Sequence, residues 1–110
     1  MIEVVNTLPK RAPTPEPGPL TKEVAGIIKG KMARYSVSQK EMAEPVGVDQ
    51  SQLSKMIRGL RPINLDQLEI MCAVLGVEID DVIDEAHSAT TNRGEWPEVD
   101  ALVLEGVRVR

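Results

Sequence analysis

Apolar residues return at intervals of three and four positions over residues 20–86, which is the spacing of helices with one buried face. Short polar or glycine-containing breaks divide this part of the chain. Five helices are predicted between the breaks, over about residues 22–34, 38–45, 49–58, 64–75 and 79–85. The fourth is the most apolar and is expected to be central, with Leu65, Leu68, Ile70, Met71, Val74 and Leu75. The pattern therefore predicts an all-α domain of five short helices.

Three of the predicted helix starts carry the same local signal. In Ser38-Gln39-Lys40-Glu41, the serine and glutamate side chains can satisfy free N–H groups of the first turn as a capping box. Asp49-Gln50-Ser51-Gln52 and Asn64-Leu65-Asp66-Gln67 repeat this arrangement with glutamine in the fourth place. Thr21 is the expected N-cap of the first helix. Glycines that favour helix termination follow three helices, at positions 47, 59 and 76.

Pro45 falls near the end of the second predicted helix. Proline has no N–H to donate, and its ring clashes with the carbonyl of the residue four positions earlier, here Glu41. We therefore expect this helix to end or bend at Pro45, and Gly47 to supply the turn that follows.

The two ends of the chain differ from the helical part. Residues 9–19 contain five prolines, so residues 1–19 are expected to form an extended proline-rich arm, in which Lys10 and Arg11 are available to touch phosphate. Residues 87–97 are polar without a period, which predicts a loop. Residues 107–110 alternate Val and Arg as a half-buried strand does. The expected organisation is an arm (1–19), a helical domain (20–86), and a loop with a C-terminal β-strand (87–110).

Composition excludes several classes of site. Aromatic residues make up 2% of the chain, which argues against stacking platforms for single-stranded nucleic acid. Cys72 and His87 are the only residues of their kinds, so neither a disulfide framework nor a zinc cluster is expected. Without a nucleophile–base pair or a glycine-rich phosphate loop, we expect neither an enzyme nor a cofactor. Without a signal peptide or an apolar run near 18 residues, we expect no membrane partner and a cytoplasmic location, in the bacterial nucleoid or a phage-infected host.

Charge is distributed unevenly along the chain, although the net value is −4. Residues 22–61 contain eight basic and four acidic residues, a difference of +4. Residues 66–85 contain seven acidic residues and no basic ones. One part of the domain can therefore face phosphates while the other faces away.

The second and third predicted helices are short and are joined by a short turn. A pair of this kind places its second helix across the first, so that the outer face can enter a major groove about 12 Å wide. Glutamine matches the N6/N7 edge of adenine, and lysine matches O6/N7 of guanine. The outward positions of the third helix are Gln50, Ser51, Gln52, Ser54, Lys55 and Arg58. This set of side chains predicts contact with double-stranded DNA.

In their order along the chain, these features resemble the lambda-repressor/Cro (Xre) helix-turn-helix family. The resemblance is carried by SQKEMA at residues 38–43, GVDQSQLS at residues 47–54, Arg58-Gly59, and the apolar stretch at residues 68–77. It covers about residues 20–86 and implies a five-helix, lambda-repressor-like DNA-binding domain. Pro45 departs from the family, in which the second helix normally continues, and leaves the angle between the second and third helices open.

The resemblance also implies roles for single residues. Gln39 would clamp a phosphate and brace Gln50, which follows eleven residues later and would read adenine. The base-reading residues are expected to be Gln50, Ser51, Gln52 and Lys55. The phosphate-binding residues are expected to be Ser38, Gln39, Lys40, Ser54, Arg58, Arg61 and Asn64.

The expected function is sequence-specific binding of a double-stranded DNA operator by a transcription regulator. We favour the hypothesis of a phage or prophage repressor, either an immunity repressor or a Cro-like protein. The antitoxin of a toxin–antitoxin pair stays open as an alternative; it would bind a toxin protein and autoregulate its operon.

A homodimer is expected because one small motif buries little DNA surface, whereas a two-fold pair reads two half-sites about 34 Å apart. The helical part shows no spare apolar patch in this pattern. The C-terminal strand is the expected contact, since a lone apolar strand needs a partner, either the same strand of a second subunit or residues 2–5 of either chain. Its apolar residues are Leu102, Val103, Leu104, Val107 and Val109. Folding of this strand back onto its own domain stays open.

Overall fold

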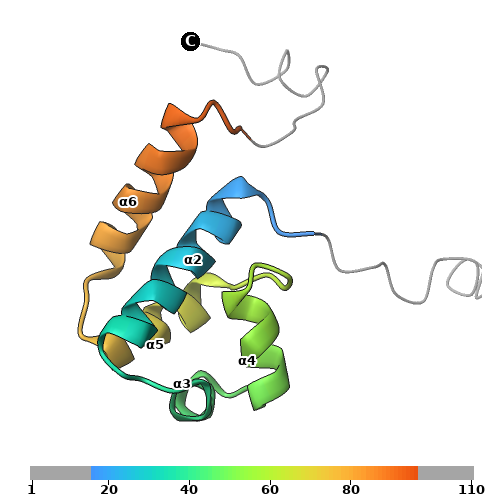
Figure 1. Cartoon of the computed structure of the whole chain (residues 1–110), viewed down its shortest axis with the longest axis vertical. Helices are drawn as coiled ribbons and strands as arrows, with labels where there is room; N and C mark the ends of the chain where they lie inside the picture. The colour runs from blue at the N-terminus through green and yellow to red at the C-terminus, as the bar shows by residue number, and fades with distance from the viewer. Residues whose placement is uncertain (1–15, 97–110) are drawn as a thin grey trace, which may run out of the picture.

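The computed structural model describes residues 16–96 of the chain (Figure 1). Within this range the chain forms five α-helices and no strand: α2 (Pro19–Arg34), α3 (Gln39–Val46), α4 (Gln50–Ile57), α5 (Leu65–Leu75) and α6 (Ile79–Asn92). The helical domain is all-α, as predicted. The arm up to residue 15 and the predicted C-terminal strand at residues 107–110 lie outside the described residues.

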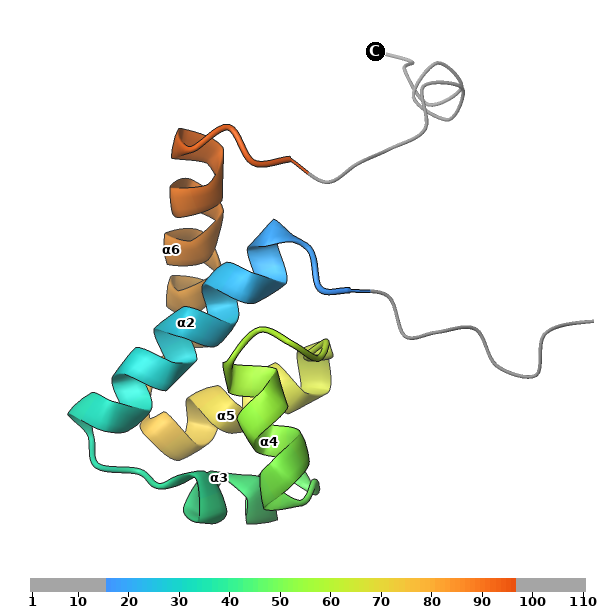
Figure 2. The same ribbon diagram turned by 45° about the vertical axis from the view of Figure 1, so that its right-hand side comes forward.

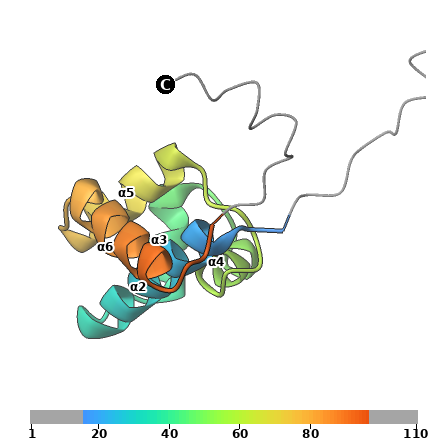
Figure 3. The same ribbon diagram turned by 90° about the horizontal axis from the view of Figure 1, so that it is seen from above.

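Helix α2 supports the rest of the fold. It packs against α4, α5 and α6, while α3 packs against α4 and α5. Figures 1 and 2 show α6 along one flank of α2, α4 on the other side and α3 at the lower end of the molecule. Seen from above, α5 and α6 lie together and α4 lies opposite them (Figure 3). Helices α2 and α5 therefore support the helix-turn-helix pair: α4 packs on α2, and α3 packs on α5.

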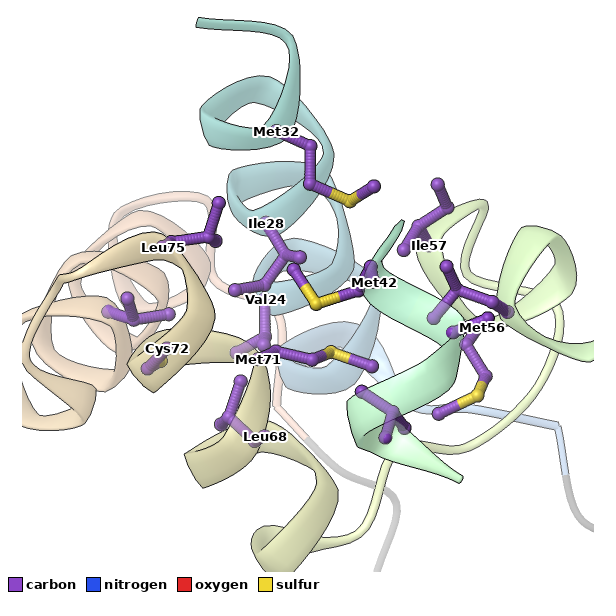
Figure 4. Close-up of a cluster of buried hydrophobic side chains, with 14 of the residues drawn as sticks. Val24, Ile28, Met32, Met42, Met56, Ile57, Leu68, Met71, Cys72 and Leu75 are labelled. Atoms are coloured by element: carbon purple, nitrogen blue, oxygen red, sulfur yellow. The ribbon is translucent and has the colours of Figure 1, made fainter. Parts of the chain in front are cut away.

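The core lies where the five helices meet and is built from aliphatic, methionine and cysteine side chains (Figure 4). Each helix contributes at least one side chain with no exposed surface, namely Ile28, Met42, Leu53, Met71 and Val82. The flexible thioether of methionine fills irregular gaps between helices, which suits a core without aromatic rings. A chain with one Trp, one Tyr and no Phe has few other side chains with which to fill this space.

Leu65 corrects the prediction for the fourth helix. It was assigned to the apolar face, but it is the first residue of α5 and is 73% exposed. Val74, on the same helix, is also exposed. The buried stripe of α5 is narrower than its composition indicated and consists of Leu68, Met71, Cys72 and Leu75. The helical part therefore does leave large apolar side chains uncovered, contrary to expectation.

The helix starts show which capping signals are used. Ser38 and Asn64 both form complete capping boxes, with the Glu41 N–H donating to Ser38 Oγ at 3.0 Å and the Gln67 N–H to Asn64 Oδ1 at 2.7 Å. Asp49 accepts from the Gln52 N–H at 2.7 Å, but the reciprocal half of the predicted box is not formed there.

The predicted N-cap of the first helix is wrong. α2 begins at Pro19 with Gly18 as its N-cap, so Thr21 lies inside the first turn. Proline is well suited to this position because its fixed φ matches the helix, and the N–H that it lacks would have no partner there. The helix consequently starts three residues earlier than predicted.

Helix α6 corrects the prediction of a loop over residues 87–97. It continues to Asn92, so residues 87–92 are helical. Ala86 and Thr90 are buried and extend the face of Val82 at intervals of four residues, and α6 packs against α2. The Thr90 hydroxyl donates to the His87 carbonyl at 3.1 Å, which satisfies it inside the structure. The apolar pattern hid this turn because threonine occupies a core position.

Candidate nucleic-acid interface

Helices α3 and α4, of eight residues each, form the helix-turn-helix unit. α3 continues one residue past Pro45 and ends at Val46, so the expected interruption occurs as a termination. Gly47 adopts the left-handed conformation with φ 84°, which residues with a side chain rarely adopt. The N–H groups of Gly47 and Val48 both donate to the Ala43 carbonyl, at 2.9 and 3.2 Å. These bonds fix the turn directly before the N-cap of α4.

The inner face of α4 anchors it to the domain. Leu53, Met56 and Ile57 are buried in the core. The predicted contact residues divide between exposed and partly covered positions. Gln50, Ser51, Lys55 and Arg58 are exposed, whereas Gln52 and Ser54 are half-buried. Positions 51, 55 and 58 are spaced to lie on one side of a helix, so the structure brings these three together.

The start of α3 carries predicted phosphate contacts next to side chains of both charges, Lys40 and Glu41. Lys40 is exposed and Gln39 is half-buried. Both the hydroxyl and the backbone N–H of Ser38 are engaged by Glu41, the latter donating to Oε1 at 2.8 Å. These bonds from Ser38 lower the pKa of Glu41, which holds its carboxylate negative. The start of α3 therefore holds the cation Lys40 next to a negative carboxylate.

The segment after α4 groups the remaining predicted phosphate contacts. Arg58 caps α4 and its Nε donates to the Ser54 carbonyl at 3.2 Å, which directs the guanidinium along its own helix. Arg61 is exposed. Asn64 is also exposed, but its side-chain oxygen and backbone N–H are used in the α5 capping box. Its amide N–H₂ group retains the capacity to donate outward.

Lys22 also belongs to this region, although its position in the sequence predicted no individual role for it. Gly59 is buried with φ 76°, and a Cβ added there would lie 3.4 Å from Cγ of Lys22. The exposed side chain of Lys22 therefore lies over the residue next to Arg58. The two positions are 37 residues apart in the chain, so no local pattern could have paired them.

Other kinds of site find no support within residues 16–96. No group of three His, Cys, Asp or Glu side chains is placed there to hold a metal ion. Burial raises the pKa of the Cys72 thiol, which disfavours the reactive thiolate. None of the described helices has both the length and the apolar character needed to cross a bilayer.

Comparison with solved structures finds proteins of the same fold. The chain is similar to a crystal structure of the clp gene regulator ClgR from Corynebacterium glutamicum, with 28% identity and a TM-score of 0.62 over 73% of this chain and 84% of that chain. A second crystal structure of that regulator gives 27% identity and a TM-score of 0.58, covering 64% and 91% of the two chains.

A hypothetical transcription factor, NHTF from Neisseria, is 26% identical with a TM-score of 0.53, over 66% of this chain and 86% of that one. No curated protein sequence matches the chain significantly. The helix-turn-helix family matches residues 28–82, which include the C-terminal part of α2, all of α3, α4 and α5, and the start of α6. With this match and the observed five-helix arrangement, the chain belongs to the lambda-repressor-like (Xre) helix-turn-helix family.

Proposed function

We propose that this protein is a transcription regulator that reads a DNA operator with the outer face of α4. The observation that carries the proposal is the division of α4 into two faces. Leu53, Met56 and Ile57 fix one face in the core, and polar side chains without a covering helix occupy the other. A short helix held in this way can enter a major groove without disturbing the domain.

Base recognition is assigned to the exposed residues of α4. Gln50 stands in the first turn, where a glutamine can pair with N6 and N7 of adenine. Lys55 lies beyond Ser51 on the same helix and can donate to guanine. Gln52 is a weaker candidate than its sequence position indicated, because it is half-buried.

Phosphate contact is assigned to residues on both sides of α4. Lys40, Gln39 and Ser38 approach from the start of α3, and Ser54, Arg58, Arg61 and Asn64 from the end of α4 and the following loop. The proposal favours Lys40, Arg58 and Arg61, which are exposed cations. Cations placed beside a reading helix position it on the duplex and release bound counterions.

Within this function we favour a phage or prophage repressor, working as a homodimer. A two-fold pair would present two α4 helices to two half-sites of one operator. The family and the regulators of similar structure support the general role in transcription. An antitoxin would use the same DNA-binding surface and differ in the protein partner of its tails.

The proposal is tested by footprinting the purified protein on genomic DNA that flanks its own gene. We expect protection of a short site with two-fold symmetry, and binding at least about a thousandfold tighter than to scrambled DNA of equal length. A Lys55→Ala variant serves as the matched control. Because it leaves the core unchanged, it should fold normally but discriminate less between the two DNAs. Equal affinity for both DNAs, in the wild-type protein, contradicts sequence-specific reading.

A further inference from the structure

An apolar groove runs along the flank where the start of α2 meets α5 and α6. Its larger part has a volume of about 340 Å³ and is lined by Pro19, Leu20, Thr90 and Trp96, among others. A smaller hollow of about 90 Å³ adjoins it at Leu20 and continues to Leu65. We call these two hollows together the flank groove.

The flank groove is bordered by large apolar side chains that the domain leaves uncovered. Leu20 is 40% exposed, Trp96 is 62% exposed, and Leu65 is 73% exposed. Isolated exposed apolar residues are ordinary, but a hollow bordered by several of them marks an interaction surface. This surface is distinct from the outer face of α4, so a partner seated here leaves the proposed reading helix free.

The end of α6 holds one wall of the groove in place. Arg93 Nη2 bonds Glu23 of α2 at 2.6 Å and Glu95 at 2.9 Å. The Glu95 N–H donates to the Thr90 carbonyl at 2.9 Å, which closes the turn after α6. Trp96 follows directly on this turn. The wall is therefore formed by contacts that the domain makes on its own.

We propose that the flank groove is the docking surface for residues 101–109 of a second copy of this chain. This inference rests on the proposed homodimeric function and names the surfaces that join the dimer. Five of the nine residues are Leu or Val, which match the apolar lining of the groove. In extended form, nine residues span about 30 Å, enough to reach across to a neighbouring subunit.

Charge favours the same occupant. The segment is followed by Arg110 and contains Arg108, with Glu105 as its one acidic residue. Asp66 and Asp84 are exposed and follow the lining residues Leu65 and Ile83 in the sequence, whereas Glu95 in the wall is already paired with Arg93. An apolar segment with a basic end therefore fits the end of the groove at Leu65 and Ile83, where the neighbouring charges are acidic.

A second copy is favoured over the chain's own segment by the length of the connection. Four residues separate Trp96 from Ala101, which leaves little length for the segment to fold back over the groove that Trp96 itself borders. Reciprocal exchange fills both grooves of a pair and generates closed two-fold symmetry. Short connections of this kind favour exchange between subunits.

The test uses full-length chains and two single variants. Leu65→Asp alters the groove at an exposed position, and Leu104→Asp alters the segment. We expect each to weaken self-association about tenfold or more in sedimentation, because each places a charge in an apolar contact. Val74→Asp is the matched control: it adds the same charge to the same helix at another exposed position and should leave the dimer intact.

Mixing the two variants decides between exchange and folding back. A Leu65→Asp chain has an intact segment, and a Leu104→Asp chain has an intact groove, so a mixed pair regains one of the two contacts. Trp96, the one tryptophan of the sequence, reports the contact through a shift of its emission to shorter wavelength when it is covered. We expect association and this shift in the mixture but in neither variant alone.

Three outcomes overturn the inference. A wild-type monomer whose Trp96 emission is independent of dilution excludes a second copy as the occupant of the groove. A dimer that persists in Leu65→Asp and Leu104→Asp is joined elsewhere. A mixture that behaves as the sum of its parts excludes exchange. Failure of the proposed function is a separate result, since it appears as unspecific DNA binding by the wild-type protein whatever its oligomeric state.

Discussion

The unit formed by α3 and α4 and the unit formed by α5 and α6 are built with similar local devices but differ in the charge of their side chains. α3 and α5 both begin with a complete capping box and end at a left-handed glycine. Residues 38–58 nevertheless balance three basic residues against three acidic ones, whereas residues 66–85 have seven acidic residues and no basic ones. Caps and buried faces specify the fold here, and the outer faces are free to specify the partner.

The difference between the two faces of α4 gives the largest expected effect. Leu53→Ala removes a side chain with no exposed surface from the core, so the free energy of unfolding should fall by about 2–5 kcal/mol. Urea denaturation measures this change. Leu60→Ala, at a position 60% exposed, is the control and should change stability by less than about 0.5 kcal/mol. Equal losses in the two variants contradict the assignment of Leu53 to the inner face.

Substitutions on the outer face of α4 are expected to change DNA binding and not stability. Gln50→Ala and Lys55→Ala should each reduce discrimination between operator and altered base pairs by about 1–3 kcal/mol, with unfolding nearly unchanged. The measurement is competition binding against a series of single base-pair changes. If both variants retain the wild-type ratio of specific to unspecific affinity, α4 is not the reading helix.

The basic residues beside the end of α4, Arg61 and Lys22, should contribute equally to the affinity for DNA of any sequence. Arg61→Ala and Lys22→Ala are each expected to reduce the slope of log K against log salt by about one unit, because each removes one phosphate contact. Lys29→Ala is the control, since it removes an exposed cation from the same helix as Lys22. If Lys22→Ala leaves the salt slope as Lys29→Ala does, Lys22 lies outside the interface.

The two capping boxes should differ in their response to acid, which is the smallest of the expected effects. The pKa of Glu41 is lowered below its ordinary value of 4.5, first by the bond from the Ser38 backbone. A lowered folded-state pKa means that the contribution is present above pH 4.5 and is lost as the pH falls through the folded value. Glu41→Gln should remove this dependence and retain the cap.

The box of α5 provides the internal comparison, because Asn64 and Gln67 do not titrate. Thermal unfolding between pH 6 and pH 3, for the wild-type chain and Glu41→Gln, measures the difference. Gln67→Glu transfers a titrating group to α5 and should introduce an acid-dependent loss there. Identical pH profiles for the wild-type chain and Glu41→Gln contradict a contribution from the Glu41 carboxylate.

Much of the helical domain could be predicted from local patterns. Ser38 and Asn64 signalled helix starts through side chains that bond their own first turn, so the signal and the structure share the same few residues. Gly47 signalled the turn before α4 because the left-handed conformation there suits glycine. The predictions failed where the deciding contact was remote. α6 continues beyond His87 because Thr90 is buried in the packed domain. Threonine is not counted as apolar, so the pattern did not predict this last part of the helix.

The amino-acid sequence by itself determined the family, the order of the helices and the polar outer face of α4. These depend on spacing and on bonds between residues three or four positions apart. Only the tertiary structure decided that Lys22 lies over Gly59, that Leu65 is exposed, and that Leu20 and Trp96 border one groove. Periodicity identifies a helix face as apolar, but burial depends on which neighbouring helix covers that face. Contacts between distant parts of the chain are fixed by the packing of whole helices, which no local pattern encodes.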